Sequence, residues 1–84
     1  MYEELQKITG ATDEQVEAFL ETLLPSERIL VENRFGLAAY SDEDIEEAAQ
    51  SLNLMDPEKQ FRLIDTAVRS LKALLKNKLM ISRN

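Results

Sequence analysis

The strongest constraint on the fold is a long apolar stripe that begins after Asp56 and Pro57. Apolar side chains recur there at spacings of three and four residues, which is the period of one helix face. The stripe consists of Phe61, Ile64, Val68, Leu71 and Leu75, and it is widened by Leu63, Ala67, Leu74 and Leu79. Aspartate followed by proline is a typical helix start, because aspartate caps the helix and proline suits its first turn. We therefore expect a helix from Pro57 to about Met80 that packs against several other helices.

Four shorter helices are expected before this one. The chain of 84 residues has only two glycines and two prolines, and it lacks the alternating β-branched pattern of strands. The first is expected at about residues 2–8, and the second begins with a capping box formed by Thr12 and Gln15. The third is expected at about residues 26–35, between Pro25 and Gly36. The fourth begins at the cap Ser41 and ends at Asn53. The sequence thus predicts one all-α domain over residues 1–84, a small bundle of about five helices, with residues 1–23 as its N-terminal helices.

The composition argues against an enzyme. The chain contains no cysteine and no histidine, which excludes disulfides, thiolate zinc sites and histidine acid–base chemistry. Acidic runs such as residues 42–44 lie at a helix start, and adjacent helical residues do not face each other as a catalytic pair. No glycine-rich phosphate loop or metal-ligand spacing occurs. We expect no catalytic residue, no cofactor, no metal and no small-molecule substrate.

The distribution of apolar residues and charge bears on location and partners. No apolar run approaches the roughly 18–20 residues of a membrane span, and the acidic start differs from a signal peptide. We expect a cytoplasmic protein that does not contact a membrane. Residues 1–54 carry thirteen acids and three bases, whereas residues 55–84 carry three acids and seven bases. The basic C-terminal third is therefore suited to contact phosphate or an acidic protein surface.

The fourth and fifth expected helices have the layout of a helix-turn-helix. Ala48 and Ala49 are small enough to allow a close helix crossing, Asn53 suits a tight turn, and a capped helix follows. This motif often binds DNA, but helical hairpins serve many functions.

Four blocks of sequence resemble region 4, the promoter −35-reading domain, of bacterial sigma-70 type sigma factors. Residues 24–25 are Leu-Pro, and residues 34–37 are Arg-Phe-Gly-Leu, which is identical to the family pattern. Residues 48–54 resemble the family's Ile-Ala-x-x-Leu-Gly-Val, and residues 67–72 resemble its Ala-Leu-Arg-Lys-Leu-Arg. The blocks occur in the family's order and cover about residues 23–76. The resemblance implies a helix-turn-helix fold and a role in transcription.

The chain departs from the family where region 4 reads DNA. The family has Ser-Arg-Glu-Arg-Val-Arg-Gln-Ile after the turn, whereas the segment 55–64 here carries Asp56 and Glu58 near its start and is about two residues longer. The preceding helix is about one turn longer and carries five acids within residues 42–47. Because a recognition helix contacts bases near its N-terminus, these acids would face phosphate. Promoter DNA is therefore a doubtful partner.

The resemblance also implies a protein-binding site. In the family, an apolar face of region 4 receives the flap-tip helix of the RNA polymerase β subunit, which needs apolar pockets rather than basic side chains. The corresponding surface here would come from Leu30, Phe35, Leu37 and Ile45, completed by Leu71 or Leu74. In small size, acidity and altered recognition helix, the chain also resembles phage late-transcription coactivators that bind the flap without reading DNA. We expect a transcription regulator that docks on bacterial RNA polymerase.

Two alternatives remain open at this point. One is a sequence-specific DNA-binding protein, whose contacts to DNA would be made by Lys59, Arg62, Arg69 and Lys72. Its affinity for DNA would fall steeply with salt. The other is a helical adaptor that binds another protein without DNA, with the basic last helix pairing to an acidic partner surface.

Overall fold

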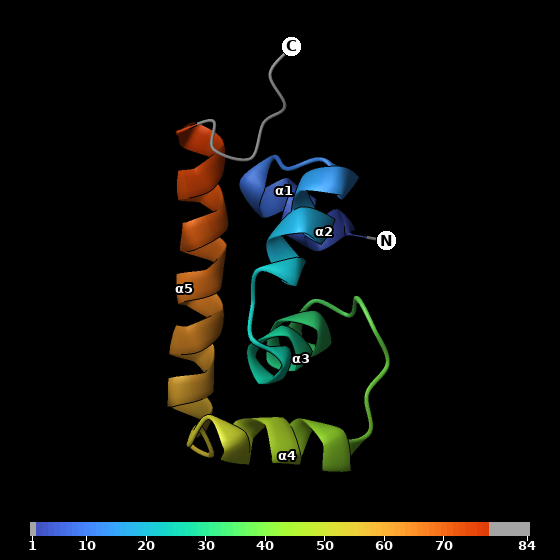
Figure 1. The fold of residues 1–84 in the computed structure, drawn as a ribbon, viewed down its shortest axis with the longest axis vertical. Coiled ribbons are helices and arrows are strands. Elements are labelled where there is room, and N and C mark those ends of the chain that lie inside the picture. Colours follow the sequence, from blue (N-terminus) through green and yellow to red (C-terminus); the bar gives the residue numbers. More distant parts are fainter. Residues whose placement is uncertain (1, 78–84) are drawn as a thin grey trace.

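The computed structural model describes residues 2–77, and these residues form five α-helices joined by short turns (Figure 1). The helices are α1 (Glu3–Thr9), α2 (Asp13–Glu21), α3 (Pro25–Arg34), α4 (Asp42–Ser51) and α5 (Pro57–Lys76). No strand occurs among the described residues. The expected all-α class and the number of helices are therefore confirmed.

The helices are arranged around α5, the longest of them (Figure 1). The C-terminal half of α5 runs beside α1 and α2, and α4 lies across its N-terminal end (Figure 1). Between them sits α3, which packs most extensively against α4 and also against α5. The long helix therefore acts as a support along which the four shorter helices are placed.

The expected helix starts are present as capping interactions. In α2, the Gln15 backbone N–H donates to the Thr12 hydroxyl at 3.1 Å, and the Gln15 side chain accepts from the Thr12 N–H at 2.9 Å. The Ser41 hydroxyl accepts from the Asp44 N–H at 3.1 Å to begin α4. At the start of α5, the Asp56 carboxylate accepts from the Glu58 N–H at 2.9 Å. Each bond satisfies a backbone donor that the helix itself leaves unpaired.

Helix ends agree with the sequence in conformation and differ in position by a few residues. Gly36 and Asn53 both have positive φ, at 67° and 57°, as expected for left-handed residues after a helix. The second helix ends at Glu21, two residues before the expected end of the N-terminal helices at residue 23. The described part of α5 ends at Lys76, and the expected continuation to Met80 lies outside the described residues.

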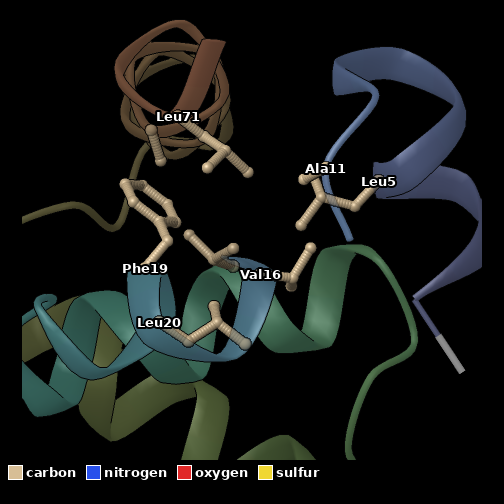
Figure 2. Packing of buried hydrophobic residues seen from close by; sticks show 8 residues of the cluster. Leu5, Ala11, Val16, Phe19, Leu20 and Leu71 are labelled. Atoms are coloured by element: carbon tan, nitrogen blue, oxygen red, sulfur yellow. The ribbon is translucent and has the colours of Figure 1, made fainter. Parts of the chain in front are cut away.

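The main hydrophobic core joins α5 to the first three helices (Figure 2). Figure 2 shows Leu71 of α5 above Phe19 and Val16 of α2, with Leu5 and Ala11 beside them. The described members of the sequence-predicted stripe divide into a buried and a more open part. Ala67 and Leu71 are buried, and Ile64, Val68, Leu74 and Leu75 pack against the cluster. The core thus uses the central and C-terminal turns of α5.

Phe61 corrects the expected course of this stripe. The prediction placed it on the buried face of the last helix, but its side chain is 63% exposed. The main cluster takes side chains of α5 from Ile64 onward, and Phe61 lies about one turn before that point. An apolar residue in register with a buried stripe is therefore buried only where another helix covers that turn.

Candidate partner-binding groove

An open groove runs along α5, between this helix and the neighbouring α2 and α3. Its volume is about 560 Å³. The residues that line it are Phe19, Thr22 and Leu23 from α2 and the following turn, Glu27 and Val31 from α3, and Leu63, Thr66, Ala67, Ser70, Ala73, Leu74 and Asn77 from α5 and its cap. The volume and the mainly apolar lining are typical of binding sites in proteins.

The groove arises from the width of the apolar face of α5. Leu71, at the centre of that face, is buried in the core. Leu63 and Leu74 lie at the edge of the face, and both are only half-buried. Between them, α5 presents Ser70 and Ala73, whose short side chains leave space above the helix backbone. A wide apolar face beside short residues therefore leaves part of its surface open to a partner.

Among the described residues that line the groove, Glu27 is the one with an acidic or basic side chain. It lies in the first turn of α3, where the helix dipole favours a carboxylate. One of its oxygens accepts a hydrogen bond from the Leu24 N–H at 3.0 Å. This bond orients the side chain, which is half-buried at the edge of the apolar surface. The groove is consequently apolar with negative charge at one position.

The residues that the sequence assigned to flap binding do not line this groove. Leu30 and Leu71 are buried, with exposed fractions of 2% and 0%. Phe35 and Leu37 are half-buried and pack against the core cluster, and Ile45 is half-buried on α4. Two of these five side chains are therefore closed off from a partner in this conformation. Leu74, the residue named beside Leu71 for the same role, does line the groove.

The four basic residues considered for DNA binding are all exposed on α5. Arg62 and Arg69 are about two helical turns apart and share a stripe, whereas Lys59 and Lys72 lie to either side of it. The Arg69 guanidinium also pairs with the Asp65 carboxylate of the same helix at 3.1 Å. The four cations therefore do not form one continuous row.

Exposed acidic side chains are frequent on α4 and at the start of α5. The exposed ones on α4 and at the start of α5 are Asp42, Glu43, Asp44, Glu46, Glu47, Asp56 and Glu58. A DNA backbone that approached α4 and the start of α5 would meet these negative charges, which is electrostatically unfavourable. The surface charge of α4 and of the start of α5 is therefore unfavourable for contact with DNA.

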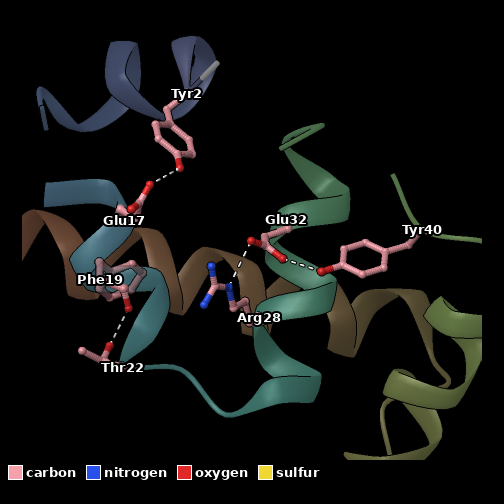
Figure 3. A network of polar contacts seen from close by, with 7 residues as sticks. All are labelled: Tyr2, Glu17, Phe19, Thr22, Arg28, Glu32 and Tyr40. Atoms are coloured by element: carbon pink, nitrogen blue, oxygen red, sulfur yellow. Dashed lines mark hydrogen bonds and ion pairs between the residues drawn. The ribbon is translucent and has the colours of Figure 1, made fainter. Parts of the chain in front are cut away.

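A buried polar cluster on α3 is the feature that sequence reasoning missed (Figure 3). Glu32 is only 8% exposed. Its carboxylate accepts from the Tyr40 hydroxyl at 2.6 Å and from the Arg28 guanidinium at 3.0 Å. The spacing of Arg28 and Glu32 could have indicated a helical ion pair. Nothing in the sequence pattern indicated that the side chain of Tyr40, from the loop after α3, would bond to Glu32.

The raised pKa values of two tyrosines predict how the stability of the protein depends on pH. The hydrogen bond to Glu32 and burial raise the pKa of Tyr40 above its ordinary value of 10.0, and a hydrogen bond to Glu17 raises the pKa of Tyr2. A raised pKa means that the folded state holds the phenol proton more tightly than the unfolded state does. The stabilisation is therefore complete below pH 10.0 and is lost as the pH rises through the folded pKa.

The expected result is an unfolding free energy that decreases with pH in the alkaline range, with a smaller slope for Tyr40→Phe than for the wild type. Urea denaturation at a series of pH values from about 8 to 12 measures both slopes. Tyr2→Phe serves as the comparison, because it removes the other tyrosine and leaves the Glu32 cluster intact. Equal slopes for Tyr40→Phe and the wild type would show that the Glu32–Tyr40 bond does not hold this proton.

Searches for metal sites, membrane spans and relatives add no assignment. Within residues 2–77, no group of three or more acidic side chains is placed to hold a metal ion. No helix in the same part of the chain is both long and apolar enough to cross a membrane. Comparisons with protein-family models, curated proteins and solved structures find no match.

Proposed function

We propose that this protein is a transcription regulator that docks on bacterial RNA polymerase through a protein–protein contact, with the flap of the β subunit as its partner. The observation that carries the proposal is the open apolar groove along α5. An apolar groove of this kind suits the helix-in-groove mode of recognition. The partner is suggested by the resemblance of residues 24–25, 34–37, 48–54 and 67–72 to sigma region 4.

The surface charge favours this proposal over promoter reading. The acids of α4 and of the first turn of α5 lie where a recognition helix would approach DNA. Of the four candidate DNA contacts, Arg69 is already engaged with Asp65. Since each phosphate contact normally releases a counterion and adds to affinity, a surface with few free cations binds DNA weakly. Docking on the polymerase needs no such contacts.

The proposal predicts that the purified protein retains bacterial core RNA polymerase in a pull-down, and that an isolated β-flap fragment competes with the polymerase. The flap fragment should also shift nuclear magnetic resonance signals of groove residues such as Leu63 and Leu74. Promoter DNA fragments should bind weakly and lose their affinity as salt rises, because only phosphate contacts are expected.

Two outcomes would contradict the proposal. One is a flap fragment that leaves every signal unchanged at concentrations where a known region 4 domain binds it. The other is tight, sequence-specific binding of DNA that is lost in the double variant Lys59→Glu and Arg62→Glu. The second outcome would favour the DNA-binding alternative, and binding of a different protein without polymerase would favour the adaptor alternative.

A further inference from the structure

We infer that the groove receives an amphipathic α-helix that lies along α5 and places a basic side chain beside Glu27. This inference deepens the proposed docking function, on which it rests, by specifying the chemistry of the bound segment. It requires that the protein bind another protein through the groove, but it does not require that this protein be RNA polymerase.

The shape of the groove favours a helix as the occupant. Leu63 of α5 and its C-cap Asn77 are fourteen residues apart, which corresponds to about 21 Å at the usual rise of an α-helix. A partner helix of about four turns matches this length. The groove volume of about 560 Å³ then holds the apolar side chains of one face of that helix, while its other face remains in solvent.

The short side chains of α5 allow such a helix to approach closely. Thr66, Ser70 and Ala73 follow one another at spacings of four and three residues, so they form a continuous row on the helix surface. The distance between two packed helices is set by the size of the side chains at their contact. Leu63 and Leu74 stand beside this row and offer apolar contact area to the incoming helix.

The backbone groups of the partner also favour a helix over an extended peptide as the occupant of the groove. An extended segment that pairs its N–H and C=O groups with backbone does so at the free edge of a sheet, and residues 2–77 contain no strand. Among the polar side chains of the groove, the Thr22 hydroxyl already donates to the Phe19 carbonyl at 2.6 Å. A helix satisfies its own backbone groups, so it enters an apolar groove without that cost.

Glu27 specifies the charge of the partner at one edge of the groove. Glu27 is half-buried against apolar side chains, and one of its oxygens is held by the Leu24 N–H. An anionic segment would be repelled here, whereas a lysine or arginine would pair with the carboxylate at the edge of the contact. Arg62, Arg69 and Lys76 are exposed on the neighbouring stripe of α5, so the preference for a basic side chain is local to Glu27.

A designed peptide tests this inference without knowledge of the natural partner. The probe is a peptide of about four turns, with leucines on one face and lysines on the other. The comparison peptide carries glutamate at every lysine position. Nuclear magnetic resonance titration should shift the signals of Leu63, Ser70, Ala73 and Leu74 with the lysine peptide. The glutamate peptide should bind at least about tenfold more weakly.

Two variants with the same chemical change locate the binding site. Ser70→Phe fills the groove and should weaken binding of the lysine peptide by at least about tenfold. Ser51→Phe is the matched control, because Ser51 is also an exposed serine in a helix but lies outside the groove. It should leave the affinity unchanged. Glu27→Gln should weaken binding by about threefold, the effect of losing a partly exposed ion pair.

Equal affinity for the two peptides, signal shifts confined to the acids of α4, or unchanged binding by Ser70→Phe would each overturn the inference. The flap fragment separates this result from the proposed function. If the flap binds and Ser70→Phe has no effect on it, the polymerase proposal stands and the groove inference fails. If the lysine peptide binds in the groove and the flap does not bind, the groove inference stands and polymerase is the wrong partner.

Discussion

Replacement of Leu71 by alanine is expected to lower the free energy of unfolding by about 3 kcal/mol. Leu71 is 0% exposed and belongs to the cluster that joins α5 to α1, α2 and α3. Its truncation removes buried methyl groups and leaves a cavity that the surrounding helices fill only in part. Because a domain of this size has a modest total stability, a loss of this magnitude removes a large fraction of it.

Urea denaturation followed by circular dichroism measures this effect, and Leu24→Ala provides the control. Leu24 is also a leucine, but its side chain is 60% exposed, so its truncation should change the unfolding free energy by less than about 0.5 kcal/mol. If the two variants lose similar stability, α5 does not pack on the N-terminal helices through Leu71. Since the groove is formed by these same helices, its geometry would then also be in question.

Local sequence signals were sufficient to predict the helices. The caps at Thr12, Ser41 and Asp56 and the left-handed residues Gly36 and Asn53 act within a few positions along the chain. Their effects depend on hydrogen bonds to neighbouring backbone groups and not on distant packing. For the same reason, the expected ends of the helices differ from the observed ones by only a few residues.

The groove could not be predicted because it depends on which helices cover which part of α5. Periodicity placed Leu71 in the apolar stripe and Leu63 and Leu74 at its widened edge, but it could not tell which of these side chains other helices would cover. Only the positions of α2 and α3 decide that Leu71 is enclosed while the other two remain half-buried. The same argument explains Phe61, which follows the period of the stripe and yet is exposed.

The proposed docking surface consequently differs from the one that the family resemblance implied. That surface depended on Leu30 and Leu71, whose side chains are buried in the protein and cannot contact a partner. The groove along α5 offers half-buried leucines and short side chains, so a partner helix can add contact area without displacing core residues. The proposed partner is thus inferred from the resemblance to sigma region 4, and the proposed site is inferred from the packing of the helices around α5.

Replacement of Glu32 by alanine is expected to lower the free energy of unfolding by about 2 kcal/mol. Glu32 holds two groups from different positions in the chain: the Arg28 guanidinium one turn earlier and the Tyr40 hydroxyl from the loop before α4. Within residues 2–77, no buried side-chain nitrogen or oxygen lacks a hydrogen-bond partner. The variant would leave the Tyr40 hydroxyl without its acceptor. The Arg28 side chain is 38% exposed and can turn to water, so it adds less to the loss.

Glu46→Ala is the matched control, because Glu46 is an exposed glutamate in the middle of α4, and the change should fall within about 0.5 kcal/mol. A double-mutant cycle with Tyr40→Phe then isolates the bond between Glu32 and Tyr40, with an expected coupling of about 1 kcal/mol. Tyr40 lies just before the Ser41 cap of α4, so this bond ties the start of α4 to α3. Hydrogen exchange of the Glu32→Ala variant is compared with that of the wild type. A larger increase in the exchange rate in α4 than in α1 would show that the bond fixes α4 locally. An equal increase in both helices would show that the bond contributes only to global stability.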